Sequence, residues 1–191
     1  MDRAELVGRV AAGEAFKYLF FWGHVPKVAG RVDASCLSQW YPAEFVVEPS
    51  GPGANEPGVS YATAEHFMMA EKARLFGDAS ALSRVLSARS PAEAKAVGRE
   101  VVGYVDDVWS KARFDAVVRG NVAKFSASPE LRTFLLETGG RILVEAAPRD
   151  TIWGIGLGRD HPRASDPSGW RGQNLLGFAL MEVRERLRRV G

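Results

Sequence analysis

Hydrophobic and polar positions follow two patterns along the chain, and the change falls near residue 62. Before it, short aromatic or β-branched runs predict strands at about residues 17–22, 46–47 and 59–61, preceded by a short helix at about 3–15. The Pro- and Gly-rich stretch EPSGPGANEPG (48–58) separates the second and third strands. Neither a helix nor a strand tolerates that composition, so we expect a surface loop inside one domain.

Helical signals dominate after residue 62. The clearest is Ser90-Pro91 followed by Glu93, because Ser caps a helix, Pro fits its first position and Glu completes a capping box. Thr63 and Asp78 are expected to cap two further helices. Besides the helix that begins at Ser90, the predicted helices span about residues 63–76, 78–88, 107–125 and 128–139.

The last part of the chain reads as a short strand, a long irregular segment and a helix. RILVE (141–145) predicts a buried strand, and residues 146–174 are rich in Gly, Pro, Asp and Trp. Such a long irregular segment inside a domain is often functional. The final helix carries an apolar stripe at spacings of mostly 3 to 4 residues: Leu175, Leu176, Ala179, Leu180, Val183 and Leu187. We therefore predict an α+β fold, predominantly α-helical, in a single compact domain (1–191) with a few short strands.

Composition and charge are those of a globular protein. Of 191 residues, 46% are hydrophobic and 25% are charged, and the net charge of +2 is too small to predict nucleic-acid binding. The one local excess of positive charge lies in the last helix: Arg184, Arg186, Arg188 and Arg189. Cations near a helix C-terminus complement its dipole, and we favour this interpretation over a phosphate-rich partner.

Cysteine and histidine usage predicts neither a disulfide nor a metal site. Cys36 is the single cysteine, which suits a reducing compartment. His24, His66 and His161 lack the spacing of metal ligands. The N-terminus lacks the basic and apolar regions of a signal peptide, and no run approaches the ~20 apolar residues of a membrane span. We expect a cytoplasmic protein without membrane contact, metal or cofactor.

The first candidate for chemistry is the helix that begins at Thr63. Glu65, Met69 and Lys72 are spaced i, i+4 and i+7, so one face presents a carboxylate and an amine about two turns apart. A solvated face with a surface lysine is the alternative. The position of Glu65 in the first turn, among apolar residues, favours a functional pair.

The second candidate is the turn after RILVE. Asp150 precedes Trp153 by three residues, which suits a pocket that stacks a flat ring and orients a hydroxyl; a turn Asp and a core Trp are the alternative. The glycines of GIGLG (154–158) are not a dinucleotide fingerprint, because the spacing is GxGxG and no helix follows. Asn174 precedes the last helix as a cap, a ligand contact or both, because a helix N-terminus also attracts phosphate.

Taken in order, a dozen short stretches resemble the NADAR family of YbiA-like proteins and cover about residues 18–188. The matching stretches are FFWGH (20–24), LSQWYP (37–42), YATAEH (61–66), KA (72–73), FGD (76–78), AK with GR (94–95 and 98–99), Trp109, KF (124–125), LL with TG (135–136 and 138–139), VEA (144–146), Asp150 with WGIG (153–156), and Gly172 with NLLG (174–177). Two departures are mild: Ser-Gln-Trp (38–40) stands where Ser-Asn-Phe is common, and the loop at 48–58 is longer than a tight turn.

The resemblance implies a mostly helical domain that hydrolyses N-glycosidic bonds. Members of the family act on phosphorylated ribosylamino-pyrimidines of early riboflavin synthesis, as metabolite damage control, or remove ADP-ribose from guanine in DNA. The implied partner is a phosphorylated small-molecule glycoside or ADP-ribose, with DNA that carries ADP-ribosyl-guanine as a further candidate.

Glycosidic cleavage passes through an oxocarbenium-like state, which explains the catalytic residues that we expect. A carboxylate near C1′ stabilises the developing charge or activates water, and Glu65 and Asp150 are the candidates. Lys72 could instead attack C1′ and form a Schiff base with the opened sugar. Arg99, Lys124 or the helix start near Asn174 could hold phosphate. The expected substrate-binding residues are Trp22, Gly23, Ser38, Trp40, Trp109, Trp153, Gly154 and Asn174.

Two other functions are weighed against the enzyme. A non-catalytic module that binds NAD or ADP-ribose would need pocket aromatics but not the acid and the amine together. This chain holds Glu65, Lys72 and Asp150, which favours the enzyme. An interaction protein without a pocket would leave residues 146–174 without ligand contacts.

Overall fold

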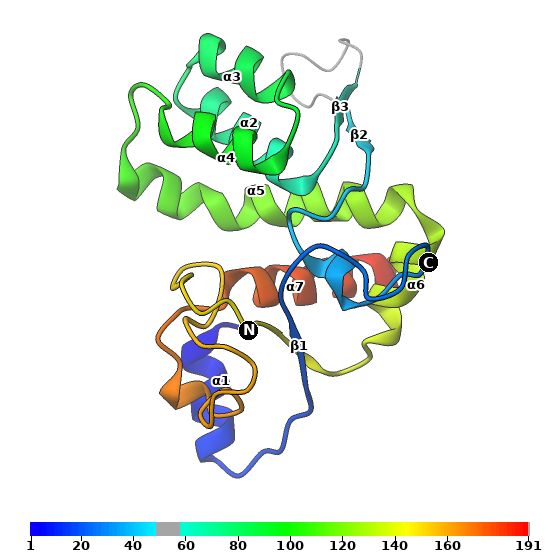
Figure 1. Cartoon of the computed structure of the whole chain (residues 1–191). Coiled ribbons are helices and arrows are strands. Elements are labelled where there is room, and N and C mark those ends of the chain that lie inside the picture. The colour runs from blue at the N-terminus through cyan, green and yellow to red at the C-terminus, as the bar shows by residue number, and fades with distance from the viewer. Residues whose placement is uncertain (49–57, 191) are drawn as a thin grey trace. The chain divides into compact units, whose positions relative to one another are not determined.

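The computed structural model describes residues 1–48 and 58–190, and its chain divides into two compact units (Figure 1). One unit is the continuous segment 39–129, and the other combines residues 1–38 with 130–191. Residues 49–57 of the expected surface loop lie outside the described residues.

The 39–129 unit is a helical cluster with one small antiparallel sheet. Its elements are β2 (Phe45–Val47), β3 (Val59–Tyr61), α2 (Ala64–Leu75), α3 (Ala79–Leu86), α4 (Pro91–Arg99) and α5 (Asp106–Ala127). Helix α2 contacts α3, α4 and α5, and Figure 1 shows α2 between its neighbours. Most of its residues are buried, as expected of a helix enclosed by others. Gly120 of α5 permits close packing, because a Cβ there would lie 2.4 Å from Cδ1 of Phe67.

The predicted helix caps of this unit are confirmed. The side chains of Thr63, Asp78 and Ser90 accept hydrogen bonds from backbone N–H groups in the first turns of α2, α3 and α4. The capping box differs from the prediction in one contact. Glu93 accepts from the N–H of Arg89 (2.8 Å) rather than from that of the cap residue Ser90.

The second unit is built on a parallel pair of strands. Its elements are α1 (Arg3–Ala11), β1 (Tyr18–Phe21), η1 (Ala34–Leu37), α6 (Pro129–Glu137, apart from its first residue), β4 (Ile142–Glu145), η3 (Pro167–Gly169) and α7 (Leu175–Arg189). Tyr18 pairs with Ile142 and Phe21 with Glu145. Both predicted strands are thus confirmed, and the carboxyl ends of β1 and β4 lie side by side.

Helix α7 packs on β4, and Asn174 connects the two elements. The Asn174 side chain donates from Nδ2 to the Leu143 carbonyl (2.9 Å) and accepts through Oδ1 from the Glu145 N–H (2.9 Å). Gly177 lies at the closest approach, because a Cβ there would be 2.0 Å from the Leu143 oxygen. The predicted apolar stripe of α7 is buried except for Leu175, which is half-buried.

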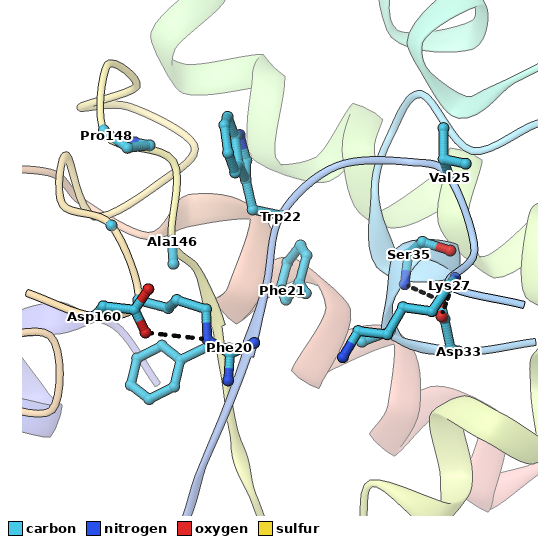
Figure 2. Close-up of a pocket in the computed structure, with 13 residues that line it drawn as sticks. Phe20, Phe21, Trp22, Val25, Lys27, Asp33, Ser35, Ala146, Pro148 and Asp160 are labelled. Carbon is cyan, nitrogen blue, oxygen red and sulfur yellow. Dashed lines mark hydrogen bonds and ion pairs between the residues drawn. The ribbon is translucent and has the colours of Figure 1, made fainter.

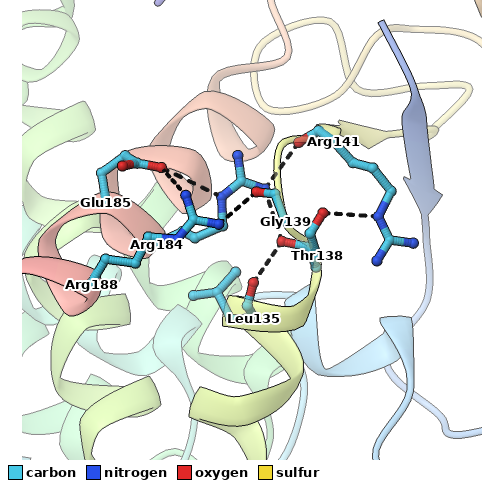
Figure 3. Close-up of polar contacts among 7 residues, drawn as sticks. All are labelled: Leu135, Thr138, Gly139, Arg141, Arg184, Glu185 and Arg188. Carbon is cyan, nitrogen blue, oxygen red and sulfur yellow. Dashed lines mark hydrogen bonds and ion pairs between the residues drawn. The ribbon is translucent and has the colours of Figure 1, made fainter. Parts of the chain in front are cut away.

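The arginines of α7 are used mainly inside the unit (Figure 3). Arg184 is 3% exposed, and its Nη1 donates to the Thr138 hydroxyl (2.8 Å) and to the Arg141 carbonyl (3.0 Å). Arg188 donates to Glu185 (2.6 Å) and to the Gly139 carbonyl (2.8 Å). Arg184 and Arg188 therefore hold the turn between α6 and β4, which accounts for much of the charge cluster without a phosphate-rich partner.

The predicted class, a predominantly α-helical α+β fold with a few short strands, is confirmed. The single domain over residues 1–191 stays a prediction. Among the helices of the described ranges, none combines the length and the apolar character needed to cross a membrane.

Candidate functional site

Glu65 is buried at the start of α2, where neighbouring side chains fix the helix end. It is 2% exposed. The Thr63 hydroxyl accepts from the His66 N–H (3.4 Å) and lies 2.8 Å from His66 Nδ1. His66 Nε2 lies 3.2 Å from the Ala88 carbonyl, an acceptor, so Nε2 carries the proton. Burial lowers the pKa of His66, against the opposing effects of the Ala88 carbonyl and Glu93. The contacts of His66 are those of a structural residue, and Glu65 is the candidate for chemistry at this helix start.

The backbone of Glu65 is tied to a buried pair of amide side chains. Its N–H donates to the Gln39 carbonyl (3.0 Å), and Asn121 Nδ2 donates to Gln39 Oε1 (2.7 Å) and to the Val117 carbonyl (2.8 Å). Gln39 is 6% exposed and Asn121 is fully buried. Buried amides that bond to each other hold a unique arrangement. The Gln39–Asn121 pair thus positions the segment that accepts a hydrogen bond from the start of α2.

Two lysines face the aromatic residues that follow Gln39. Lys124, on α5 and 1% exposed, places Nζ 5.5 Å from the centroid of the Tyr41 ring. Lys95, on α4, places Nζ 5.8 Å from the centroid of the Trp40 ring. Cations over aromatic faces are electrostatically favourable, more so when they are desolvated. The 39–129 unit therefore buries an acidic residue, Glu65, on α2 and a basic one, Lys124, on α5. Both residues contact the short segment 39–41.

Lys72 is half-buried at the far end of α2. Its Nζ donates to the Gly98 carbonyl (2.7 Å) at the end of α4 and lies 4.0 Å from the centroid of the Tyr104 ring. Burial lowers the pKa of the Lys72 amine, and the charge of Asp106 acts in the opposite direction. A lowered pKa favours the neutral amine that a nucleophile needs. The same contacts also suit a residue that closes the C-terminus of α4.

Asp150, in the other unit, organises the turn that follows β4. Its Oδ1 accepts from the N–H groups of Ile152 (2.9 Å), Trp153 (2.7 Å) and Gly154 (3.4 Å). These bonds hold a tight turn against the strand end, where a Cβ on Gly154 would lie 2.9 Å from the Glu145 oxygen. Asp150 therefore has the contacts of the turn residue that was the alternative interpretation, and Trp153 on this turn is half-buried.

The start of α7 is closed by the same turn. The N–H groups of Asn174, Leu175 and Leu176 donate to the carbonyls of residues 152–154 at 3.1 to 3.2 Å. Asn174 occupies the cap position with φ 56°, but its side chain bonds β4 and makes no cap hydrogen bond. Because these donors are engaged, this helix start offers little to a phosphate. The contacts of Asn174 are those of a structural residue.

A pocket of about 470 Å³ lies where β1 and β4 end (Figure 2). It is lined from three stretches of the chain: Phe20, Phe21, Trp22, Val25 and Lys27; Asp33, Ala34 and Ser35; and Ala146, Pro148, Gly158, Arg159 and Asp160. Trp22 was expected to bind substrate, and its side chain is 68% exposed. Gly23 follows with φ 81°, a conformation that glycine adopts without strain and that turns the chain after Trp22. The carboxyl ends of parallel strands are a common place for ligands.

The remaining expected residues have varied surroundings. Trp109 is 7% exposed in α5, Trp40 and Ser38 are half-buried, and Arg99 is exposed. The roles of Gln39 and Asn121 were missed by sequence reasoning. The signal available for Asn121 was a polar residue between Val117-Val118 and Phe125 on one face of the long helix.

Comparison with known proteins agrees with this fold. The chain matches the NADAR domain model over residues 20–188. It is 40% identical to the N-glycosidase R617 of Acanthamoeba polyphaga mimivirus, over 90% of this chain and 97% of that protein. It is 32% identical to the riboflavin biosynthesis protein PYRR of Zea mays, over 71% of this chain and 21% of that protein. Its fold is similar to the NMR structure of the E. coli protein YbiA, with a TM-score of 0.69 and 25% identity, over 91% of this chain and 86% of that chain.

The class that these findings define is that of enzymes acting on N-glycosyl compounds. Relatives that are 31% and 40% identical, including YbiA itself, are named N-glycosidases, so the predicted hydrolase class is confirmed at the level of the family. The chain belongs to the NADAR family.

Proposed function

We propose that this chain hydrolyses the ribose–nitrogen bond of a phosphorylated glycoside. The substrate is a ribosylamino-pyrimidine phosphate of early riboflavin synthesis, removed as metabolite damage control, or an ADP-ribosyl group on guanine. The names of the relatives support this assignment, one an N-glycosidase and another a riboflavin biosynthesis protein. The observation that carries the proposal is the carboxylate of Glu65, buried at a helix start that already has its own cap.

Glu65 suits the charge that develops during the reaction. Departure of the nitrogen leaves positive charge on C1′ and the ring oxygen of ribose. A carboxylate beside C1′ stabilises that charge, or takes a proton from the attacking water. The dipole at the start of α2 favours negative charge in the first turn, where Glu65 lies.

Lys72 leaves two routes open. In the first, the neutral amine attacks C1′, and the base departs with the electron pair of the glycosidic bond and takes up a proton from the amine. The ring oxygen then leaves C1′ and takes up the second amine proton, which gives an imine that water later hydrolyses to release the sugar and the lysine. In the second, water attacks directly and Lys72 remains a charged residue that holds the end of α4. The lowered pKa of Lys72 supports the first route, and its bond to the Gly98 carbonyl supports the second.

The experiment that tests the proposal offers both substrates side by side. The protein is incubated with ribosylamino-pyrimidine phosphate and, separately, with DNA carrying ADP-ribosyl-guanine, and the released sugar is followed by mass spectrometry. EDTA is present throughout, because we expect no metal requirement. Turnover of at least one substrate is expected.

The control is Asp107→Asn, which alters an exposed acidic residue in the first turn of α5. It should retain the activity that Glu65→Gln loses. Binding without turnover by the parent protein would contradict the proposal and support a non-catalytic module for NAD or ADP-ribose.

A further inference from the structure

The pocket at the ends of β1 and β4 presents a large aromatic side chain to solvent. Trp22 is 68% exposed, whereas the preceding Phe21 is 3% exposed and belongs to the core. Figure 2 shows the Trp22 ring beyond Phe21, with Pro148 and Ala146 on one side and Val25 on the other. An exposed indole within a concave site indicates a binding surface, because burial of its apolar area by a ligand is favourable. A flat ring stacked on Trp22 would cover it.

The loop that forms one wall of the pocket is held in place by Asp33. Its Oδ2 accepts from the Lys27 N–H and its Oδ1 from the Ser35 N–H, both at 2.8 Å. Burial alone would raise the pKa of Asp33, but these hydrogen bonds and the charge of Lys27 lower it overall. The Asp33 carboxylate is therefore used to shape the loop. A loop fixed before binding loses little entropy when a ligand arrives.

Two cations line the same pocket. Figure 2 shows the Lys27 side chain extending toward the side of the pocket on which Phe21 lies. Arg159 is the second cation, and its side chain is 64% exposed. Its neighbour Asp160 lies 3.7 Å away and is 97% exposed, so this surface pair is weak and leaves the guanidinium available to an anion. Arginine and lysine are the residues that recognise phosphate.

We propose that this pocket binds a flat heteroaromatic ring and its phosphate, with Trp22 stacked on the ring and Lys27 and Arg159 on the phosphate. A volume of about 470 Å³ accommodates a nucleotide-sized group, since small-molecule pockets have about 300–1,000 Å³. The assignment rests on the proposed function, because a phosphorylated N-glycoside carries both a ring and a phosphate. It adds the residues that recognise each part.

The test measures binding of simple probes by calorimetry in a metal-free buffer. Uridine 5′-monophosphate carries both groups, uridine lacks the phosphate, and ribose 5-phosphate lacks the ring. The monophosphate should bind more tightly than either fragment. Trp22→Ala should weaken its binding by about 10-fold or more, the scale of one stacked base, and leave ribose 5-phosphate nearly unaffected. Trp22→Phe, which keeps a ring, should recover most of the loss.

Lys27→Gln should weaken binding of the monophosphate but not of uridine, and should reduce the salt dependence of binding. Lys17→Gln is the matched control, because it removes an exposed lysine of the same unit that does not line the pocket. Adenosine 5′-monophosphate in place of the uridine compound tells an adenine ring from a pyrimidine. Unchanged binding of the monophosphate in Trp22→Ala, with a native circular dichroism spectrum, overturns the proposal. So does the absence of binding by the parent protein.

The outcome separates this proposal from that of the activity. Binding of the monophosphate tests the pocket, and release of the sugar from an N-glycoside tests the activity. If the probe pattern holds and no N-glycoside is hydrolysed, the pocket stands and the proposed activity fails. If hydrolysis proceeds with the same KM in Trp22→Ala, the activity stands and the pocket assignment fails.

Discussion

The two acidic residues expected to act on substrate lie in different surroundings. Asp150 is half-buried, and its Oδ1 accepts hydrogen bonds from three backbone N–H groups of the turn that it closes. Glu65 is 2% exposed at a helix start where Thr63 already serves as the cap. The turn accounts for the presence of Asp150, whereas the cap of α2 is supplied by Thr63 and not by Glu65. A buried acid that is not the helix cap is the better candidate for catalysis.

The largest effect is expected for Glu65→Gln. This change removes the charge and keeps the shape, so we expect a loss of at least ~10²-fold in kcat/KM with little change in the melting temperature. Steady-state kinetics and thermal melting measure the two quantities. A variant that melts several degrees lower and keeps its rate would show that Glu65 is structural, and the contrast with Asp150 would disappear.

Asp150→Ala should act on stability. It leaves three N–H groups of the turn without their acceptor, and we expect a loss of about 1–2 kcal/mol in the free energy of unfolding, as for the loss of a helix cap. Urea unfolding measures this change, with Asp160→Ala as the control, because that side chain is 97% exposed. Unchanged stability together with a large loss of rate would instead place Asp150 in catalysis.

Lys72→Arg tests whether the amine is a nucleophile. Arginine keeps the charge but cannot form the imine, so we expect a loss of about 10-fold or more in rate, within the range of such a chemical group. Borohydride added during turnover should trap an adduct on Lys72, located by mass spectrometry. Full activity of Lys72→Arg would assign the attack to water.

The lowered pKa of Lys72 also predicts a dependence of stability on pH. Between the lowered pKa of the folded state and the ordinary value of 10.5, the unfolded chain binds more protons, so the free energy of unfolding should rise with pH. Comparing parent and Lys72→Arg by urea unfolding across alkaline pH isolates this contribution. The same slope in both proteins would argue against it.

Asp150→Asn should have the smallest effect. The amide oxygen still accepts hydrogen bonds from the N–H groups of Trp153 and its neighbours. The free energy of unfolding should therefore stay within about 1 kcal/mol of the parent's, and the rate should stay close to that of the parent. Measured beside Asp150→Ala, this variant separates the hydrogen bonds of the turn from the charge. A loss of rate comparable to that of Glu65→Gln would make the two acids equivalent.

Local signals made the helices predictable. Thr63, Asp78 and Ser90 begin helices because each side chain bonds to an N–H a few residues away, and such contacts can be inferred from spacing. The task of Asn174 could not be inferred in this way. Its cap position was predicted, but its side chain bonds the backbone of β4, a partner about thirty residues earlier whose position depends on the whole unit.

In the candidate site, too, some residues could be predicted from the local sequence and others could not. Glu65 was singled out by its place in a first turn among apolar residues, which is a local property. The burial of Lys124 and the Gln39–Asn121 bond depend on how α5 packs, and spacing along the chain does not contain that information. Trp22 was expected through family resemblance alone, because an aromatic run predicts a strand without telling which ring faces solvent.

The pairing of β1 with β4 has a consequence for synthesis of the protein. Residues 39–129 form one continuous unit, whereas β1 pairs with β4, which follows that unit in the sequence. The middle segment can therefore fold while the ribosome is still translating, and the first strand emerges several seconds before its partner at ordinary elongation rates. During that interval the aromatic run of β1 has an open strand edge, which is the kind of surface that chaperones cover.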